Sequence, residues 1–315
     1  MRISTTWAQQ LGVNAMLMQQ SKLSETQMQL STGKKYLSPS DNVAATSNAL
    51  DISTSLSVTK QYEANAKSVV SRLSAEESVL GGSVDIMDRL KELAIQGQNG
   101  TLSAPDRTVL GEEALQLLDS MVGLANTVGP NGDYLFSGLK SQTLPFNKTL
   151  AAAGPPAVYN FPWQGNAVPP APANEQRTIE IGPSRSVADG DSGYYVFGSA
   201  PTSAGPTQDI FTTIQKFANN MLSNTPQSSD IADLELATQR LRTVRSNVGD
   251  RLNAVDDQSG INKAYVLQMQ QTLSQVQDLD YTEAISKLNL QTQSLQAAQQ
   301  SYIKVQGLSL FNYLR

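Results

Sequence analysis

The stretch DYTEAISKLNLQTQSLQAAQQSYIKVQGLSLFNYLR, residues 280–315, carries a seven-residue repeat of large side chains. The repeat consists of Tyr281, Leu288, Leu295 and Tyr302, and Ala284, Ala298 and Val305 lie between them. A strict seven-residue repeat is typical of a helix that supercoils around another helix. No proline follows Pro226, so nothing in this stretch breaks a helix. The sequence therefore predicts a long C-terminal helix that needs a partner along its length.

The beginning of the chain carries a similar repeat. Met16, Leu23, Leu30 and Leu37 recur every seven residues, and Val13 lies on the adjoining position. Residues that flank both repeats are mostly Gln, Ser and Thr, so few ion pairs would support a coiled coil. Helices of this kind are marginal without packing. We expect the two ends to pair as an antiparallel coiled coil and to order fully on assembly with neighbouring copies. A self-contained bundle without polymerisation is an equal alternative on periodicity alone.

The prolines divide the chain. Of 14 prolines, 11 lie between Pro130 and Pro206, so long helices are expected only on the two flanks. Short runs of β-type residues at 134–138, 177–181 and 193–198 stand between clusters of Gly, Pro and Asn. The predicted fold class is therefore mainly α with an inserted β-rich domain (α+β).

Local signals in the flanks give the expected helices and domains. A second helix is expected over 43–96, with Ile52, Leu56, Val70, Leu73, Leu80, Val84 and Met87 on one apolar stripe. A third begins near Pro105 with Ser103 as its cap, and helices resume near Thr207. The predicted domains are a coiled-coil segment 1–40, a helical part 41–129, a β-rich insertion 130–206, a second helical part 207–279 and a coiled-coil segment 280–315.

Composition excludes several classes of function. The net charge is −5, so the sequence has no excess of basic residues to bind a phosphate backbone. Nucleic acid is therefore not an expected partner. Because Cys and His are both absent, zinc sites built on them, thiol nucleophiles and Ser-His-Asp triads are excluded. No apolar stretch is long enough to cross a bilayer, so no membrane insertion is expected. The opening MRISTTWAQQ has no apolar signal-peptide core, so export would use another route.

The acidic residues do not form a recognisable catalytic or metal site. Glu76-Glu77, Glu112-Glu113 and Asp256-Asp257 are adjacent pairs, and adjacent helical residues do not face each other. They are interpreted as solvated surface. Asp189-Gly190-Asp191 lacks the remaining ligand spacing of a calcium loop and is interpreted as a turn. We therefore expect no enzyme activity, no catalytic residue, no metal site and no cofactor.

Five segments resemble one known family. They are MRIST at the start, QLSTGKKYLSPSDNVAA (29–45), NGDYLFSG (131–138), VGDRLNAVDDQ (248–258) and the C-terminal stretch 280–315. Together they resemble the flagellin-like subunits of the bacterial flagellum, in particular the branch found at the hook–filament junction. SPSDN in place of a di-acidic, alanine-rich start, together with the aromatic ending LFNYLR, favours this branch over flagellin itself. Residues 148–204 carry no motif of the family.

The resemblance implies a secreted structural subunit that self-assembles in a helical ring between hook-associated protein 1 and flagellin. It also implies an inner coiled coil, a helical middle layer, a variable outer β-rich domain, and unfolded export through the flagellar type III apparatus with a cytoplasmic chaperone. A flagellin-type filament subunit is the near alternative. A secreted helical adaptor that does not polymerise is the more distant one.

The assembly interface is expected in the terminal segments. Its predicted residues are Ile3, Trp7, Val13, Met16, Leu23, Leu30, Leu37, Tyr281, Leu288, Leu295, Tyr302, Val305, Leu308, Leu310 and Phe311. Trp7 is expected to become buried on assembly.

Overall fold

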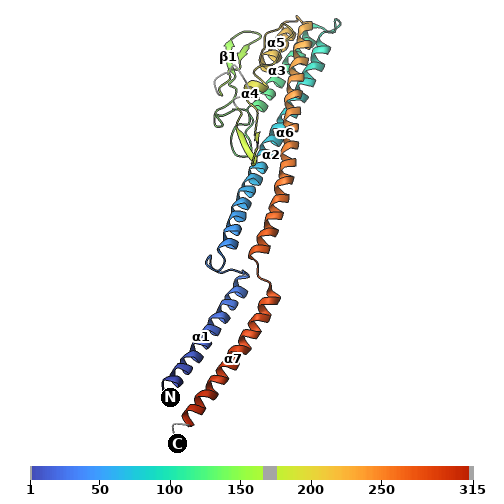
Figure 1. Ribbon diagram of the computed structural model, residues 1–315. Coiled ribbons are helices and arrows are strands. Elements are labelled where there is room, and N and C mark those ends of the chain that lie inside the picture. The colour runs from blue at the N-terminus through green and yellow to red at the C-terminus, as the bar shows by residue number, and fades with distance from the viewer. Residues whose placement is uncertain (1, 166–175, 312–315) are drawn as a thin grey trace. The chain divides into compact units, whose positions relative to one another are not determined.

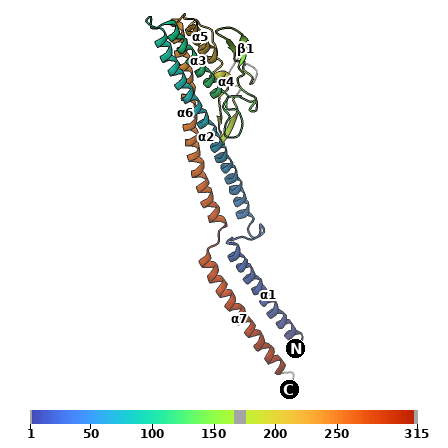
Figure 2. The same cartoon turned by 180° about the vertical axis from the view of Figure 1, so that it is seen from behind.

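Helices form both ends of the chain in the computed structural model, which describes residues 2–165 and 176–311 (Figures 1 and 2). The helices are α1 (Arg2–Thr32), α2 (Val43–Gly97), α3 (Ala104–Ala125), α4 (Gly193–Val196), α5 (Ile210–Leu222), α6 (Ser228–Gln277) and α7 (Tyr281–Phe311). The strands are β1 (Thr149–Ala152), β2 (Val158–Asn160), β3 (Thr178–Gly182) and β4 (Arg185–Ala188). The predicted class, mainly α with a small β component, is confirmed.

The chain divides into two compact units. The terminal unit contains Met1–Thr59 and Ala264–Arg315, and the core unit contains Lys60–Lys263. Helices α2 and α6 contribute residues to both units. The finer division into five segments that the sequence suggested remains a prediction.

The hydrophobic core lies in the core unit, where α2, α3, α5 and α6 supply most of its side chains. The large apolar residues that α5 turns toward this core are all fully buried: Ile210, Phe211, Ile214, Phe217 and Met221. Phe211 also packs edge-on against Phe146, with ring centroids 4.8 Å apart. An aromatic cluster therefore joins α5 to the segment between α3 and β1.

Two of the three predicted β runs are wrong. Residues 134–138 contribute only an isolated bridge between Val128 and Tyr134, and Gly193–Val196 is the short helix α4. Phe136 and Phe197, which gave these runs their β character, are fully buried with ring centroids 5.2 Å apart. The third run is confirmed as β3, which pairs antiparallel with β4, while β1 and β2 form a second hairpin.

The helix predictions need one correction in α2. Val70 is 37% exposed, whereas Val69 is fully buried. The buried positions continue the three–four alternation through Ala66, Val69 and Leu73, so Val70 falls just outside the stripe. The predicted start of α3 is confirmed. Ser103 caps the helix and exchanges hydrogen bonds with Asp106 in a capping box.

Candidate assembly surface of the terminal helices

Helices α1 and α7, here called the terminal helix pair, run antiparallel with the two chain ends at the same end of the pair (Figures 1 and 2). Helix α1 stops at Thr32 because Gly33 adopts a left-handed φ of 67°. Asp280 caps α7, because its Oδ1 accepts a hydrogen bond from the Thr282 amide at 2.8 Å. At this end of the pair, the end of α1 and the beginning of α7 are therefore both fixed by local backbone signals.

Backbone hydrogen bonds join the two connectors beside these helix ends, which are residues 33–42 between α1 and α2 and residues 278–280 between α6 and α7. The Lys35 amide donates to the Gln277 carbonyl at 2.8 Å, and the Leu279 amide donates to the Gly33 carbonyl at 3.0 Å. They form an isolated antiparallel bridge between Lys34 and Asp278. The connectors thus hold the start of α7 beside the end of α1.

The inner face of the terminal helix pair is lined by small and polar side chains as well as leucines. Among the side chains described in these two helices, those classed as buried are Thr26, Ala284 and Gln291. The Thr26 hydroxyl donates to the Lys22 carbonyl at 3.0 Å. The Gln291 side-chain oxygen has no hydrogen-bond partner among the described residues. Because small and polar groups contribute little transfer free energy, the pair is only weakly stabilised by its own packing.

The outer faces carry large apolar side chains. Trp7 is 67% exposed and Leu290 is 65% exposed. Further exposed apolar residues of the pair are Leu11, Leu17, Met18, Met28, Ile285 and Ile303. Scattered exposed apolar residues are ordinary. Here, however, most of the exposed large apolar residues that the structure describes lie in the terminal unit. The buried apolar side chains described in that unit are only Ala49 and Ala284. Apolar surface gathered in this way is typical of an interaction site.

The predicted interface residues fall into three groups. Met16, Leu23, Leu30, Leu288, Leu295 and Tyr302 are half-buried on the inner face, and Leu37 is half-buried in the connector. Trp7, Val13 and Tyr281 are exposed. The side chains of Ile3, Val305, Leu308, Leu310 and Phe311 lie outside the described residues. The inner-face group therefore serves pairing within one chain.

Sequence reasoning missed two sets of residues. The first is the small and polar half of the inner face: Gly12, Gln19, Thr26 and Gln291. Steps of three and four residues from Met16 lead to Gly12, Gln19 and Thr26, so the helical period predicts that they share a face with Met16. A pattern of apolar residues alone does not include them. The second is the part of the outer apolar set that lies beyond the predicted Trp7, Val13 and Tyr281, namely Leu11, Leu17, Met18, Met28, Ile285, Leu290 and Ile303, which follow no single seven-residue repeat.

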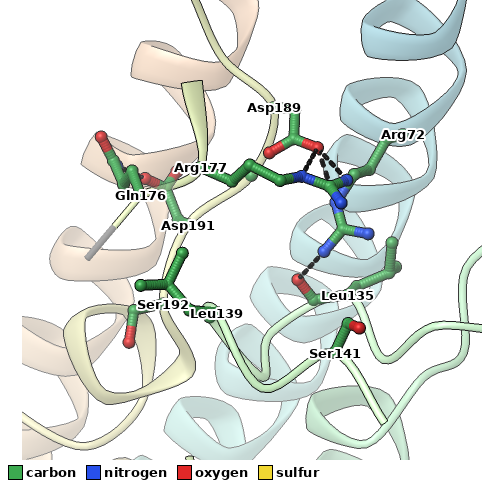
Figure 3. Close-up of a pocket in the computed structure, with 11 residues that line it drawn as sticks. Arg72, Leu135, Leu139, Ser141, Gln176, Arg177, Asp189, Asp191 and Ser192 are labelled. Atoms are coloured by element: carbon green, nitrogen blue, oxygen red, sulfur yellow. Dashed lines mark hydrogen bonds and ion pairs between the residues drawn. The ribbon is translucent and has the colours of Figure 1, made fainter. Parts of the chain in front are cut away.

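The core unit contains a separate buried polar cluster, shown in Figure 3. Arg72 on α2 donates to the Leu135 carbonyl at 2.9 Å and lies 3.8 Å from Asp189. Arg177 donates to Asp189 at 2.8 Å. These residues, together with Asp191, line a cavity of about 60 Å³. Asp189 and Asp191 are thus engaged by guanidinium groups, since Arg251 pairs with Asp191.

Glu76 extends this cluster and corrects the sequence interpretation. It was expected to be solvated surface, but it is only 1% exposed. One carboxylate oxygen accepts a hydrogen bond from the Asp191 amide at 3.1 Å. Burial, and next the nearby Asp191 carboxylate, raise the pKa of Glu76 well above its ordinary value. Its neighbour Glu77 is paired with Arg245 at 2.6 Å, as expected for a residue nearer the surface.

The cluster holds the segment after β4 against the helices through Arg72, Arg177 and Arg251. The described residues contain no group of three or more acidic side chains placed to hold a metal ion. No helix among them is long and apolar enough to cross a membrane. The terminal helix pair is therefore the strongest candidate for a functional surface.

Comparison with known proteins points to the flagellum. The family model for the bacterial flagellin N-terminal helical region matches residues 3–141. The chain is 28% identical to flagellar hook-associated protein 3 of Escherichia coli (strain K12), over 99% of both chains. It is 31% identical to polar flagellin C of Vibrio parahaemolyticus, over 38% of this chain and 31% of the flagellin.

A solved structure shows the same fold. Flagellar hook-associated protein 3 from Legionella pneumophila superposes with a TM-score of 0.62 and 21% identity, over 71% of this chain and 98% of that one. The similarity to hook-associated protein 3 thus spans the whole chain, whereas that to the flagellin covers little more than one third of it.

Proposed function

We infer that this chain is a structural subunit of the bacterial flagellum, a hook-associated protein 3 that joins the hook to the flagellin filament. The observation that carries this inference is the end-to-end similarity to hook-associated protein 3 of Escherichia coli. A filament subunit is less well supported, because the similarity to flagellin is confined to part of the chain. A structural role is also consistent with a molecule whose main functional feature is an apolar helix surface.

Self-assembly through the terminal helices is the proposed mechanism. The inner face of the terminal helix pair is occupied within one chain, so contacts between copies must use the outer faces. Trp7, Met18 and Leu290 are among the most exposed apolar side chains in the described part of the pair. Burying each such side chain would contribute about 1.5–3 kcal/mol. A neighbouring copy that covers these faces would therefore supply the stability that the pair lacks by itself.

The predicted interface residues take different parts in this mechanism. Trp7, Val13 and the exposed part of Tyr281 would contact neighbouring subunits, whereas Leu23, Leu288 and Leu295 would act indirectly by holding the pair together. Residues 1–40 and 280–315 would form the inner part of the ring. The helical segments 41–129 and 207–279 would form the middle layer, and the insertion 130–206 would lie outside.

The proposed partners follow from the junction role. Hook-associated protein 1 would bind on the hook side, and flagellin on the filament side. The chain would reach this extracellular position through the flagellar type III export apparatus, with a cytoplasmic chaperone. No catalytic step is proposed.

A reconstitution experiment separates the candidate functions. Purified chain is mixed with purified hook-associated protein 1, flagellin is then added, and products are examined by sedimentation and electron microscopy. A junction subunit binds hook-associated protein 1 and supports flagellin growth from the resulting complex. Long filaments of the chain alone would favour a flagellin-type subunit. Binding to hook-associated protein 1 without polymerisation or flagellin growth would favour an adaptor.

A further inference from the structure

Two close contacts join the N-terminal segment to tyrosines of α7, one at the connector end of the pair and one at Gly12, within α1. A methyl group on Gly12 would lie 3.3 Å from Cδ2 of Tyr302, and one on Gly33 would lie 2.8 Å from the Tyr281 hydroxyl oxygen. Gly33 also has a left-handed φ of 67°. Both this backbone conformation and the contact with Tyr281 therefore disfavour a side chain at position 33. Each of these two tyrosines of α7 therefore packs against a glycine, one within α1 and one directly after it.

The spacing of these contacts is the same on both helices. Gly12 and Gly33 are three heptads apart, and so are Tyr281 and Tyr302. The register that they define brings Leu23 opposite Gln291 and Leu30 opposite Ala284. Each layer between the two contacts then sets a large side chain of one helix against a small or polar one of the other.

The middle layers do not select this register by themselves. Large and small positions repeat every seven residues on both helices, so a slip of one heptad, about 10 Å, would preserve their alternation. The slip would, however, place Tyr302 opposite Gln19 or Tyr281 opposite Thr26. The side chains of Gln19 and Thr26 would both occupy space that a glycine leaves open for the tyrosine ring.

We propose that Gly12 and Gly33 are sockets for Tyr302 and Tyr281, and that these two contacts fix the register of the terminal helix pair. The scarcity of flanking charges explains the need for such a device, because ion pairs beside the seam usually set register in coiled coils. The register also determines how the outer apolar residues of α1 and α7 are aligned. The proposal concerns pairing within one chain and does not depend on the flagellar role.

Disulfide trapping can measure the register because the chain has no cysteine of its own. Leu23→Cys is combined in the full chain with Ala284→Cys, Gln291→Cys or Ala298→Cys, which are one heptad apart. Disulfide yields are measured by mass spectrometry in a dilute glutathione redox buffer. Because a disulfide requires close Cα atoms, we expect the 23/291 pair to exceed the other two by about tenfold.

Removing both tyrosines tests their role. In Tyr281→Ala/Tyr302→Ala, the preference for the 23/291 pair should fall by about fivefold or more, as expected for loss of a register-specifying contact. The matched control Ile285→Ala/Ile303→Ala changes two exposed residues of the same helix and should leave it unaltered. Gly12→Tyr alone should also weaken the preference, and Gly12→Tyr/Tyr302→Gly should restore it.

Two results would overturn the proposal. An unchanged preference after loss of both tyrosines would mean that the backbone bridge between the connectors sets the register alone. Equal yields of the three cysteine pairs in the otherwise unaltered chain would mean that the pair has no fixed register.

Discussion

At the scale of single residues, Glu76 shows why a local sequence pattern can mislead. Glu76 and Glu77 look equivalent in the sequence, but a helix turns each residue toward a different neighbour. Glu76 continues the buried alternation of Val69, Leu73 and Leu80, so its carboxyl group enters the core unit. The groups that make this tolerable, the Asp191 backbone amide and the Arg251 guanidinium, are distant in sequence. Helical periodicity could have placed Glu76, but its partners could not have been predicted from spacing.

We predict that Glu76→Gln stabilises the chain in a pH-dependent way. The raised pKa of Glu76 means that the fold favours its protonated form. Stability contributed by the neutral carboxyl group is therefore lost as the pH rises from the ordinary value of 4.5 through the raised pKa. The neutral amide escapes this loss, and each unit of pKa shift corresponds to about 1.4 kcal/mol. Urea unfolding between pH 4 and pH 9 should show an advantage for the variant that grows with pH.

The matched control is Glu77→Gln, whose carboxylate pairs with Arg245 near the surface. Such a pair contributes about 0–1 kcal/mol, so the variant should show no growing advantage as the pH rises. A Glu76→Gln chain that is less stable than the unaltered chain throughout this pH range would contradict the assignment.

At the scale of elements, the sequence predicted long helices far better than short strands. Helix α3 was found from its cap and proline, and α2 from its length without proline, because these signals are local. Residues 193–198 were misread because Tyr195, Val196 and Phe197 favour a strand, whereas the aromatic cluster in the core sets their conformation. Tertiary packing of this kind overrides intrinsic β preference.

The two faces of α7 should respond differently to charge. Leu295→Asp would place an unpaired charge on the inner face, which is costly to bury. It should reduce trapping of the 23/291 cysteine pair by about tenfold and abolish assembly. Leu290→Asp lies on the exposed face and should abolish assembly while leaving trapping within about twofold, as surface changes usually do.

Assembly for this comparison is scored by electron microscopy of cells that carry either variant as their sole copy. Leu288→Asp should behave as Leu295→Asp does, since both are half-buried on the inner face. Normal filaments on the hooks of Leu295→Asp cells would refute the role of the inner face. Normal filaments in Leu290→Asp cells would refute contacts between copies through the outer face.

At the scale of the whole molecule, apolar burial is unevenly distributed. The contiguous hydrophobic core belongs to the core unit, and the described residues of the terminal unit bury only alanines among their apolar side chains. The heptad repeats indicated that the ends are helical, but they could not indicate how little surface these helices would bury. The buried apolar surface depends on which faces of the two helices pair. The heptad repeats of large apolar residues do not include Gly12, Thr26 and Gln291, which also lie on the inner face.

We therefore predict two levels of stability within one chain. Hydrogen exchange, read by mass spectrometry, should be slow in α3 and α5 of the dilute chain and at least about a hundredfold faster in α1 and α7, because local stability follows buried contacts. On assembly, exchange in α1 and α7 should slow while that in α5 stays unchanged, since association stabilises the segments whose surface it covers. Resistance of α1 and α7 to exchange or to protease in the dilute chain would show that the terminal helix pair is already self-sufficient. The apolar residues on its outer face would then contribute to recognition between subunits without being needed for its folding.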